Sequence, residues 1–301
     1  MQFRRAKKNV NGVFLLDKPL GFSSNQALQK VKWLYSAAKA GHTGTLDPLA
    51  TGLLPICLGE ATKFAQYVTD ADKTYFATIK LGATTTTGDA EGEVLTTAPV
   101  KLTHAQFQAA SQQFIGEISQ VPPMYSALKH EGRALYEYAR AGVDIERQAR
   151  YITIQNILVN AFEGDVAQIT VTCSKGTYIR TLAEDIGTTL GCGAHLIGLR
   201  RTETAGYLLL QAVTIEQLEA MSIDAREALL LPIDSAIESL PVVTLNADAA
   251  FYLMQGQAVW QAGKMPSGDM RLYDEHNNFL GLGWMQDDGK IAPKRLIKNA
   301  S

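Results

Sequence analysis

The feature that most constrains the fold is a strict alternation of side chains over residues 74–82. Tyr75, Ala77, Ile79 and Leu81 fall on one side of this stretch, and the residues between them fall on the other. Successive side chains of a strand point to opposite faces, so the pattern predicts a strand with one face in a core. Residues 166–173 predict a second strand, and the apolar run 13–16, stopped by a proline and a glycine, predicts a third.

Helical patterns lie between these strands in an irregular order. Ser23 and Gln26 form a capping box ahead of an apolar stripe that includes Leu28, Val31 and Leu34. A Thr cap predicts a helix over 103–114, and a further apolar stripe predicts one from about residue 179. Because strands and helices do not alternate regularly, we expect an α/β (α+β) fold with a mixed, largely antiparallel sheet.

Composition excludes several classes of protein. The chain has 301 residues, of which 46% are hydrophobic and 19% charged, so it is not a disordered protein and has room for about two domains. No apolar run reaches the length of a membrane span, and no apolar segment follows the basic leader as in a signal peptide. Three scattered cysteines and five scattered histidines show no disulfide or metal-binding spacing. We therefore expect a cytoplasmic protein without a bound metal.

The formal net charge of −2 hides an uneven distribution. Residues 211–250 carry a net charge of −6, which leaves +4 for the remainder of the chain. Basic residues gather at both ends and, among tyrosines, within 124–150, and they include Arg4, Arg5, Lys7, Lys8, Lys290, Lys294, Arg295 and Lys298. Cations among aromatic rings suit contacts with phosphates and bases, although a solvated surface explains each cluster equally well.

Residues 41–55 are the most informative segment for chemistry. Glycines and prolines interrupt the segment too often for one helix or one strand, so it predicts a shaped loop that runs into a strand. Within the loop, Asp47 precedes Pro48 and is surrounded by leucines. A carboxylate in such surroundings needs a cationic partner to stay ionised. Asp47 is therefore either a catalytic nucleophile or part of a common Asp-Pro turn.

This segment and several others resemble the bacterial TruB family of tRNA pseudouridine-55 synthases. The matching blocks follow the family's order from about residue 11 to residue 201, and they occupy 12–19, 41–55, 59–63, 72–75, 123–129, 173–180 and 190–195. The resemblance implies the pseudouridine synthase fold with a central RNA cleft. It also implies a small C-terminal PUA-like β domain, for which the motifs are weaker.

The same resemblance implies an isomerase that converts a uridine of the tRNA T-loop to pseudouridine without a cofactor. Asp47 corresponds to the nucleophile, and whether it attacks C6 of the base or C1′ of the ribose is open. Arg180 corresponds to the arginine that pairs with this carboxylate. Tyr75 corresponds to the aromatic residue that stacks on the target base, where its hydroxyl can assist removal of the C5 proton.

Further substrate contacts are implied at lower specificity. Tyr178 and Leu199 match residues of the pocket, and His42 matches a histidine that fills the space left by the flipped nucleotide. Lys18 either contacts a phosphate or positions a catalytic loop. Asp89 matches an acidic residue with a structural or RNA-contact role.

The resemblance also divides the chain. We expect a catalytic domain over 1–240 and a PUA-like RNA-binding domain over 241–301, which the spacing of its glycines predicts to be all-β. A thumb-like insertion at about 124–150 would clamp the RNA. A helix over 132–141 would present Arg133, Tyr136 and Arg140 on one face.

The expected partner is the T-arm of tRNA, with no membrane, no obligatory protein partner and a monomeric enzyme. Three other readings are open. The chain could be a tRNA-binding or tRNA-folding protein whose catalysis is incidental, a guide-dependent synthase acting on ribosomal RNA, or a glycosylase that releases uracil.

Overall fold

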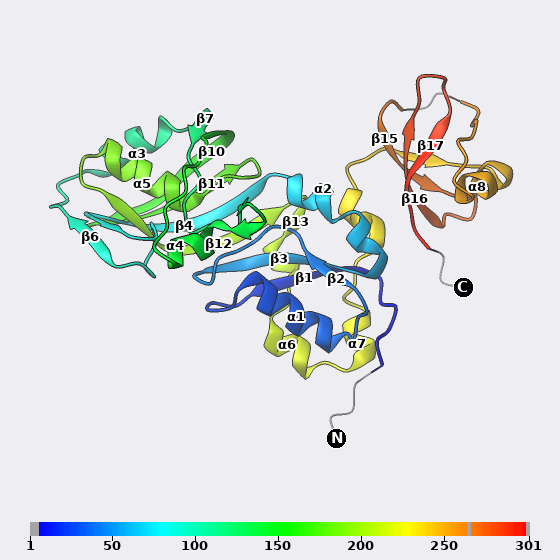
Figure 1. Cartoon of the computed structure of the whole chain (residues 1–301), viewed down its shortest axis with the longest axis horizontal. Coiled ribbons are helices and arrows are strands. Elements are labelled where there is room, and N and C mark those ends of the chain that lie inside the picture. The colour runs from blue at the N-terminus through cyan, green and yellow to red at the C-terminus, as the bar shows by residue number, and fades with distance from the viewer. Residues whose placement is uncertain (1–5, 264–265, 299–301) are drawn as a thin grey trace.

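The computed structural model describes residues 6–263 and 266–298, so the basic residues Arg4 and Arg5 lie outside the described residues. Figure 1 shows one long sheet with helices along it and a small separate sheet near the C-terminus. In the described residues the long sheet has nine strands, with the order β1-β3-β12-β4-β11-β10-β7; β2 joins it beside β3 and β13 beside β12. Its pairings are antiparallel except that of β12 with β3. The predicted mixed, largely antiparallel sheet is confirmed.

The strands of the long sheet are β1 (Gly12–Lys18), β2 (Ala40–His42), β3 (Ala50–Leu58), β4 (Lys73–Leu81), β7 (Gly116–Gln120), β10 (Arg150–Glu163), β11 (Val166–Cys173), β12 (Ala194–Thr204) and β13 (Tyr207–Leu208). Four further strands form two small hairpins, β5 (Ala83–Thr85) with β6 (Val94–Thr97) and β8 (Lys129–His130) with β9 (Arg133–Ala134). The C-terminal sheet consists of β14 (Val242–Thr244), β15 (Asp269–Tyr273), β16 (Phe279–Met285) and β17 (Ile291–Leu296). The helices are α1 (Ser24–Leu34), α2 (Ala65–Asp70), α3 (His104–Gln112), α4 (Leu135–Arg140), α5 (Ile179–Thr189), α6 (Ile215–Ala220), α7 (Ile223–Glu227) and α8 (Ala247–Met254), with short 3-10 turns η1 (Gly59–Lys63), η2 (Leu209–Gln211) and η3 (Ile233–Ile237).

The central strand β4 follows the alternation predicted from the sequence. Its odd-numbered residues from 73 to 81 are buried and the residues between them are half-buried. Tyr75 lies opposite Val171 of β11 and Arg201 of β12, which places it at the middle of the sheet. The capping box predicted at Ser23 is present, and the Thr cap predicted at Thr103 forms a capping box with Gln106. Local rules therefore located these strands and helix starts correctly.

The polar, threonine-rich tract over 84–92 begins in a strand. Thr84 and Thr85 belong to β5, which pairs with β6, and the hydroxyls of Thr84 and Thr96 lie 2.6 Å apart. Threonine favours strands as well as turns, so a polar tract of threonines does not by itself distinguish a strand from a loop.

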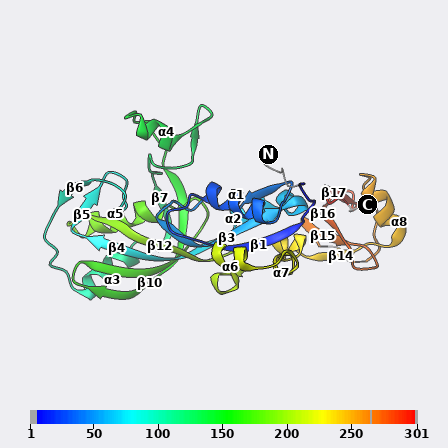
Figure 2. The ribbon, with the colours of Figure 1, turned by 90° about the horizontal axis from the view of Figure 1, so that it is seen from below.

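The helix expected over 132–141 is wrong at its beginning. Gly132 adopts a φ of +82° and closes the hairpin of β8 and β9, so Arg133 belongs to a strand and the helix α4 begins only at Leu135. The guanidinium of Arg133 instead lies over the ring of Tyr138, 4.9 Å from its centroid. Figure 2 shows that this segment stands away from the long sheet.

The C-terminal sheet has its own apolar cluster, to which the helix α8 contributes Ala249, Ala250 and Leu253. The predicted C-terminal β domain is confirmed, but it is not all-β, because Asn246 caps a helix by accepting a hydrogen bond from the amide of Ala249. Contacts with the α2 region hold this sheet, including a 2.5 Å hydrogen bond from the Tyr67 hydroxyl to Asp269. Of the helices in the described residues, none combines the length and apolar character needed to cross a bilayer.

We predict that Gly52→Ala lowers the free energy of unfolding by about 2–5 kcal/mol. Gly52 has a φ of +98°, and a Cβ there would lie 2.4 Å from the carbonyl oxygen of Arg201. Gly206→Ala is the matched control, since Gly206 has a φ of +80° but open space around it, and we expect a loss of about 1–2 kcal/mol. Urea unfolding measures both; equal losses would contradict the proposed close approach of β3 and β12.

Candidate active site

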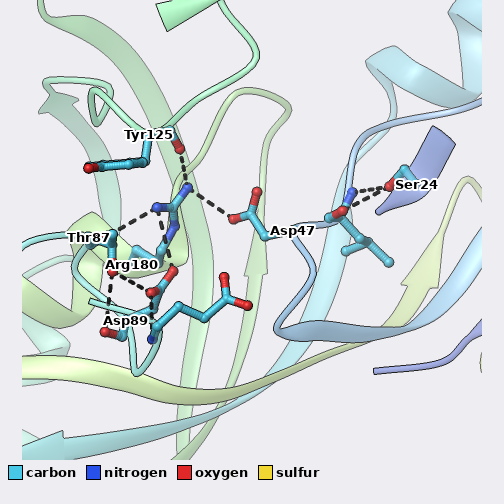
Figure 3. Close-up of polar contacts among 8 residues, drawn as sticks. Ser24, Asp47, Thr87, Asp89, Tyr125 and Arg180 are labelled. Carbon is cyan, nitrogen blue, oxygen red and sulfur yellow. Dashed lines mark hydrogen bonds and ion pairs between the residues drawn. The ribbon is translucent and has the colours of Figure 1, made fainter. Parts of the chain in front are cut away.

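Asp47 lies in the loop between β2 and β3, and the start of helix α1 holds that loop in place. The Ser24 hydroxyl donates to the carbonyl of Leu46 at 2.9 Å and accepts from the Leu46 amide at 2.7 Å (Figure 3). The amide of Gly21 donates to the carbonyl of Pro48 at 2.9 Å. The two backbone neighbours of Asp47 are thus fixed from one side, which sets the direction of its carboxylate.

Arg180, the second residue of α5, meets this carboxylate. Its Nη2 lies 3.0 Å from Oδ2 of Asp47 and also donates to the carbonyl of Tyr125 at 2.6 Å. Its Nη1 donates to the carbonyl of Thr87 at 3.0 Å and lies 3.6 Å from Oδ2 of Asp89 (Figure 3). The guanidinium is nearly buried, and its charge is balanced by two carboxylates and two carbonyls from three different loops.

Burial raises the pKa of Asp47, and the negative charge of Asp89 raises it further. The positive charges of Arg180 and Lys18 lower the pKa of the same carboxyl. The Asp47 side chain is 40% exposed, whereas that of Arg180 is 6% exposed. The carboxylate is thus an accessible group whose ionised form depends on a buried cation, as a nucleophile or base requires.

Asp47 opens into a cavity of about 710 Å³. Tyr75 from β4, Tyr178 at the start of α5 and Leu199 from β12 line the same cavity, so the structure brings four of the predicted site residues to one place together with Arg180. Basic side chains outnumber acidic ones on its walls; the basic ones are Lys73, Arg150, Lys175, Arg180 and Arg201, and the acidic ones Asp47 and Asp70. Such a cavity suits an anionic ligand with a flat ring.

Lys18 and His42 lie elsewhere. Lys18 is fully buried, and its ammonium donates to the carbonyls of Pro19 at 3.0 Å and Phe22 at 2.5 Å, which leaves it no surface for a substrate phosphate in this conformation. Of its two predicted roles, the structure favours loop positioning. His42 lies in β2 opposite Ile56 and is not among the described residues that line the cavity. Burial and the Arg201 charge lower the pKa of His42, so its ring is neutral at pH 7.

Asp89, predicted to have a structural or RNA-contact role, is buried. Its Oδ1 accepts from the Thr87 hydroxyl at 2.5 Å and from the amide of Glu91 at 3.1 Å. These bonds and the approach to Arg180 give it a structural place behind the pair of Asp47 and Arg180, where it is too buried for direct contact with RNA.

Sequence reasoning missed Arg201, whose side chain is only 1% exposed. Its Nε donates to the carbonyl of Leu53 at 2.7 Å and its Nη2 to that of Gly44 at 3.2 Å. Both ends of the segment that carries Asp47 are therefore tied to β12. No local signal in the sequence could have found Arg201, because its neighbours Arg200 and Thr202 are polar as well and its contacts reach residues far away along the chain.

Comparison with known proteins identifies the fold. A chain in the crystal structure of a Cbf5–Nop10–Gar1 complex matches with a TM-score of 0.72 at 27% identity, over 95% of this chain and 84% of that one. A chain in the structure of an H/ACA RNP bound to a substrate RNA containing 2′-deoxyuridine matches with a TM-score of 0.71 at 22% identity, over 99% of this chain and 92% of that one, and shows the fold alone.

Sequence comparison extends the likeness to the whole length. The family model for the N-terminal domain of TruB family pseudouridylate synthases matches residues 32–179. Models of TruB C-terminal domains match 180–238 and 241–297. Proteins named tRNA pseudouridine synthase B are 63% identical in Methylobacillus flagellatus, over 100% of this chain and 99% of that protein, and 52% identical in Stutzerimonas stutzeri, over 99% of each.

The sheet and these matches define a pseudouridine synthase fold with a C-terminal β-rich module, as predicted. Within that class, the chain belongs to the TruB family of pseudouridylate synthases. The predicted resemblance is confirmed.

We predict that the free energy of unfolding depends on pH through the buried Lys18. Burial lowers the pKa of Lys18 from 10.5 to about 8. Between these values the folded protein loses a proton that the unfolded chain keeps, so the free energy of unfolding rises with pH. Lys18→Met removes this contribution. Between about pH 7.5 and about pH 9.5, the stability of the wild type should therefore rise relative to the variant by about 1–2 kcal/mol.

Chemical denaturation at the two pH values measures that difference. Lys73, whose pKa is likewise lowered to about 8, is present in both proteins and cancels. A difference that does not change with pH would show that Lys18 titrates normally.

Proposed function

We propose that this chain converts uridine 55 in the T-loop of tRNA to pseudouridine, with Asp47 as the nucleophile. The observation that carries the assignment of Asp47 is its 3.0 Å ion pair with Arg180 at the wall of a basic cavity. The whole-length relatives named tRNA pseudouridine synthase B support tRNA as the substrate. Purified enzyme and a T-arm stem-loop suffice for the test.

The reaction needs three events at the base. The bond between C1′ and N1 breaks, the uracil turns, and C5 bonds to C1′; the proton on C5 leaves and N1 takes up a proton. No atom is gained and no electron is transferred. Asp47 attacks either C6 of the base or C1′ of the ribose, and Arg180 holds the carboxylate ionised and directed into the cavity.

Tyr75 provides a ring against which the uracil can stack. Burial raises the pKa of Tyr75, so its phenol is protonated at neutral pH. This state supports stacking and hydrogen bonding, whereas removal of the C5 proton by Tyr75 would require the disfavoured phenolate. Tyr178 and Leu199 complete the walls, and His42 would fill the stack once the nucleotide has left it.

Three parts of the chain would hold the RNA. The exposed cations of the cavity, Arg150 and Lys175, meet its phosphates. The segment 124–150 clamps the RNA as a thumb, with Arg133 and Arg140 stacked on tyrosine rings.

Residues 241–301 form an accessory RNA-binding domain, and residues 1–240 form the catalytic domain. Each part has an apolar cluster of its own, which supports this division, and a third cluster joins Leu282 of β16 to the catalytic part. A monomeric cytoplasmic enzyme without an obligatory protein partner fits a surface that must remain open to tRNA.

We predict that Asp47→Asn abolishes pseudouridine formation and leaves tRNA binding within about threefold of the wild type, because the amide fills the same space without a nucleophilic charge. Release of the hydrogen on C5 reports the reaction, and filter binding reports affinity. Asp165→Asn is the matched control, since Asp165 pairs with Lys80 on the surface and should leave the rate unchanged. Isomerisation by the Asp47 variant would exclude Asp47 as the nucleophile and favour an RNA-folding protein with incidental activity.

We also expect the purified chain to act alone on a bare T-arm stem-loop and to sediment as a monomer of 32.7 kDa. The solved structures with the same fold include a Cbf5–Nop10–Gar1 complex and an H/ACA RNP bound to a substrate RNA, so the guide-dependent alternative predicts that partners are required. A strict need for additional proteins or a guide RNA would revive it. Release of free uracil would identify a glycosylase instead.

A further inference from the structure

Gln120 occupies an unusual place at the base of the thumb. It is the last residue of β7, it pairs with Arg150 at the beginning of β10, and only 3% of it is exposed. The chain between these two residues contains the thumb. Pro122 and Pro123 follow almost at once, and neither can donate to a sheet, so β7 must end here. A buried amide at this point needs partners outside the ladder.

The partners of the Gln120 amide lie on another element. Its Oε1 accepts from the backbone amide of Tyr178 at 2.8 Å, and its Nε2 donates to the carbonyl of the same residue at 3.2 Å. One side chain thus holds both backbone polar groups of a single residue. These two hydrogen bonds fix the position of Tyr178 and also the orientation of its peptide groups.

Tyr178 is the N-cap residue of α5, and its own side chain makes no capping bond. In a capping box, the side chain at the third helical position bonds to the N-cap amide. That position holds Thr181, whose hydroxyl has no hydrogen-bond partner among the described residues. Gln120 therefore supplies from a distant strand the bond that the helix lacks locally.

The first turn of α5 carries both Tyr178, which lines the cavity, and Arg180, which pairs with Asp47. A small rotation of this turn moves the guanidinium away from the carboxylate. The thumb contacts the guanidinium itself through the carbonyl of Tyr125 (Figure 3). We infer that Gln120 is a positioning residue that ties the base of the thumb to the start of α5 and so aligns Arg180 with Asp47.

The inference rests on the proposed function, because its main readout is the rate of pseudouridine formation. Gln120→Met keeps the length and approximate volume of the side chain and removes both bonds. We expect the single-turnover rate constant with saturating enzyme to fall about tenfold or more, since small misplacements of catalytic groups have large effects. The dissociation constant for a T-arm stem-loop should change by less than about twofold. A purely structural role would reduce the fraction of active enzyme and leave the rate constant of that fraction unchanged.

Gln112→Met is the matched control. The Gln112 amide also joins two elements, donating from α3 to the carbonyl of Ile157 in β10 at 2.9 Å. Its loss should leave the rate constant at the wild-type value. A Gln120→Met variant with a wild-type rate constant would overturn the inference and leave the proposed function intact.

A second measurement does not depend on activity. Hydrogen exchange of the backbone amides over residues 178–182 should become faster in Gln120→Met and stay unchanged in Gln112→Met. An inactive wild type would contradict the proposed function, and hydrogen exchange alone would then test the positioning role of Gln120. Unaltered protection in Gln120→Met would overturn that role, and faster exchange would support it.

Discussion

The structure depends on one buried guanidinium. Arg180 cannot be removed from water without partners for its charge and its donors, and it finds them in Asp47, Asp89 and the carbonyls of Thr87 and Tyr125. These partners belong to the loop after β2, the loop after β5 and the base of the thumb. The requirement of a single side chain therefore brings together three segments that are far apart in the sequence. Of the two carboxylates, Asp47 has a side chain that is 40% exposed and Asp89 one that is 4% exposed, so the network directs its one accessible carboxylate into the cavity.

The loop that carries Asp47 is held by a helix and by a strand of the long sheet. Ser24 fixes it from α1, and Arg201 fixes its two ends from β12. Such support restricts where the carboxylate can go before any substrate arrives, which is the condition for effective catalysis by position. Lys18 contributes in the same way, as a buried cation that shapes the neighbouring loop. The buried cations in this part of the fold thus act mainly on the backbone, while Arg150 and Lys175 of the cavity wall stay exposed.

Sequence reasoning succeeded where the determining forces are local. Alternation located β4, and helix caps located the starts of α1 and α3. It failed at α8, which a single asparagine cap begins in a segment rich in turn residues, and at Gly132, where a left-handed backbone made a hairpin in place of a helical turn. The motif blocks named most of the residues that meet at the cavity. They could not reveal the bonds of Arg201 or of Gln120. These bonds join residues more than fifty positions apart, so they produce no periodic pattern in the sequence.

The net charge of the whole chain likewise does not show how the charges are distributed over the structure. The net charge of −2 gives no sign of an RNA-binding surface, yet the cavity wall carries five basic residues and two acidic ones. Several acids of the segment 211–250 are neutralised by cations from elsewhere, as Glu219 is by Lys30, Glu227 by Lys8 and Asp234 by Arg271. These acids serve contacts between elements, so their charge does not oppose the field at the cavity. An anionic substrate responds to the local arrangement of charges within about a Debye length, which for this chain is positive where Asp47 lies.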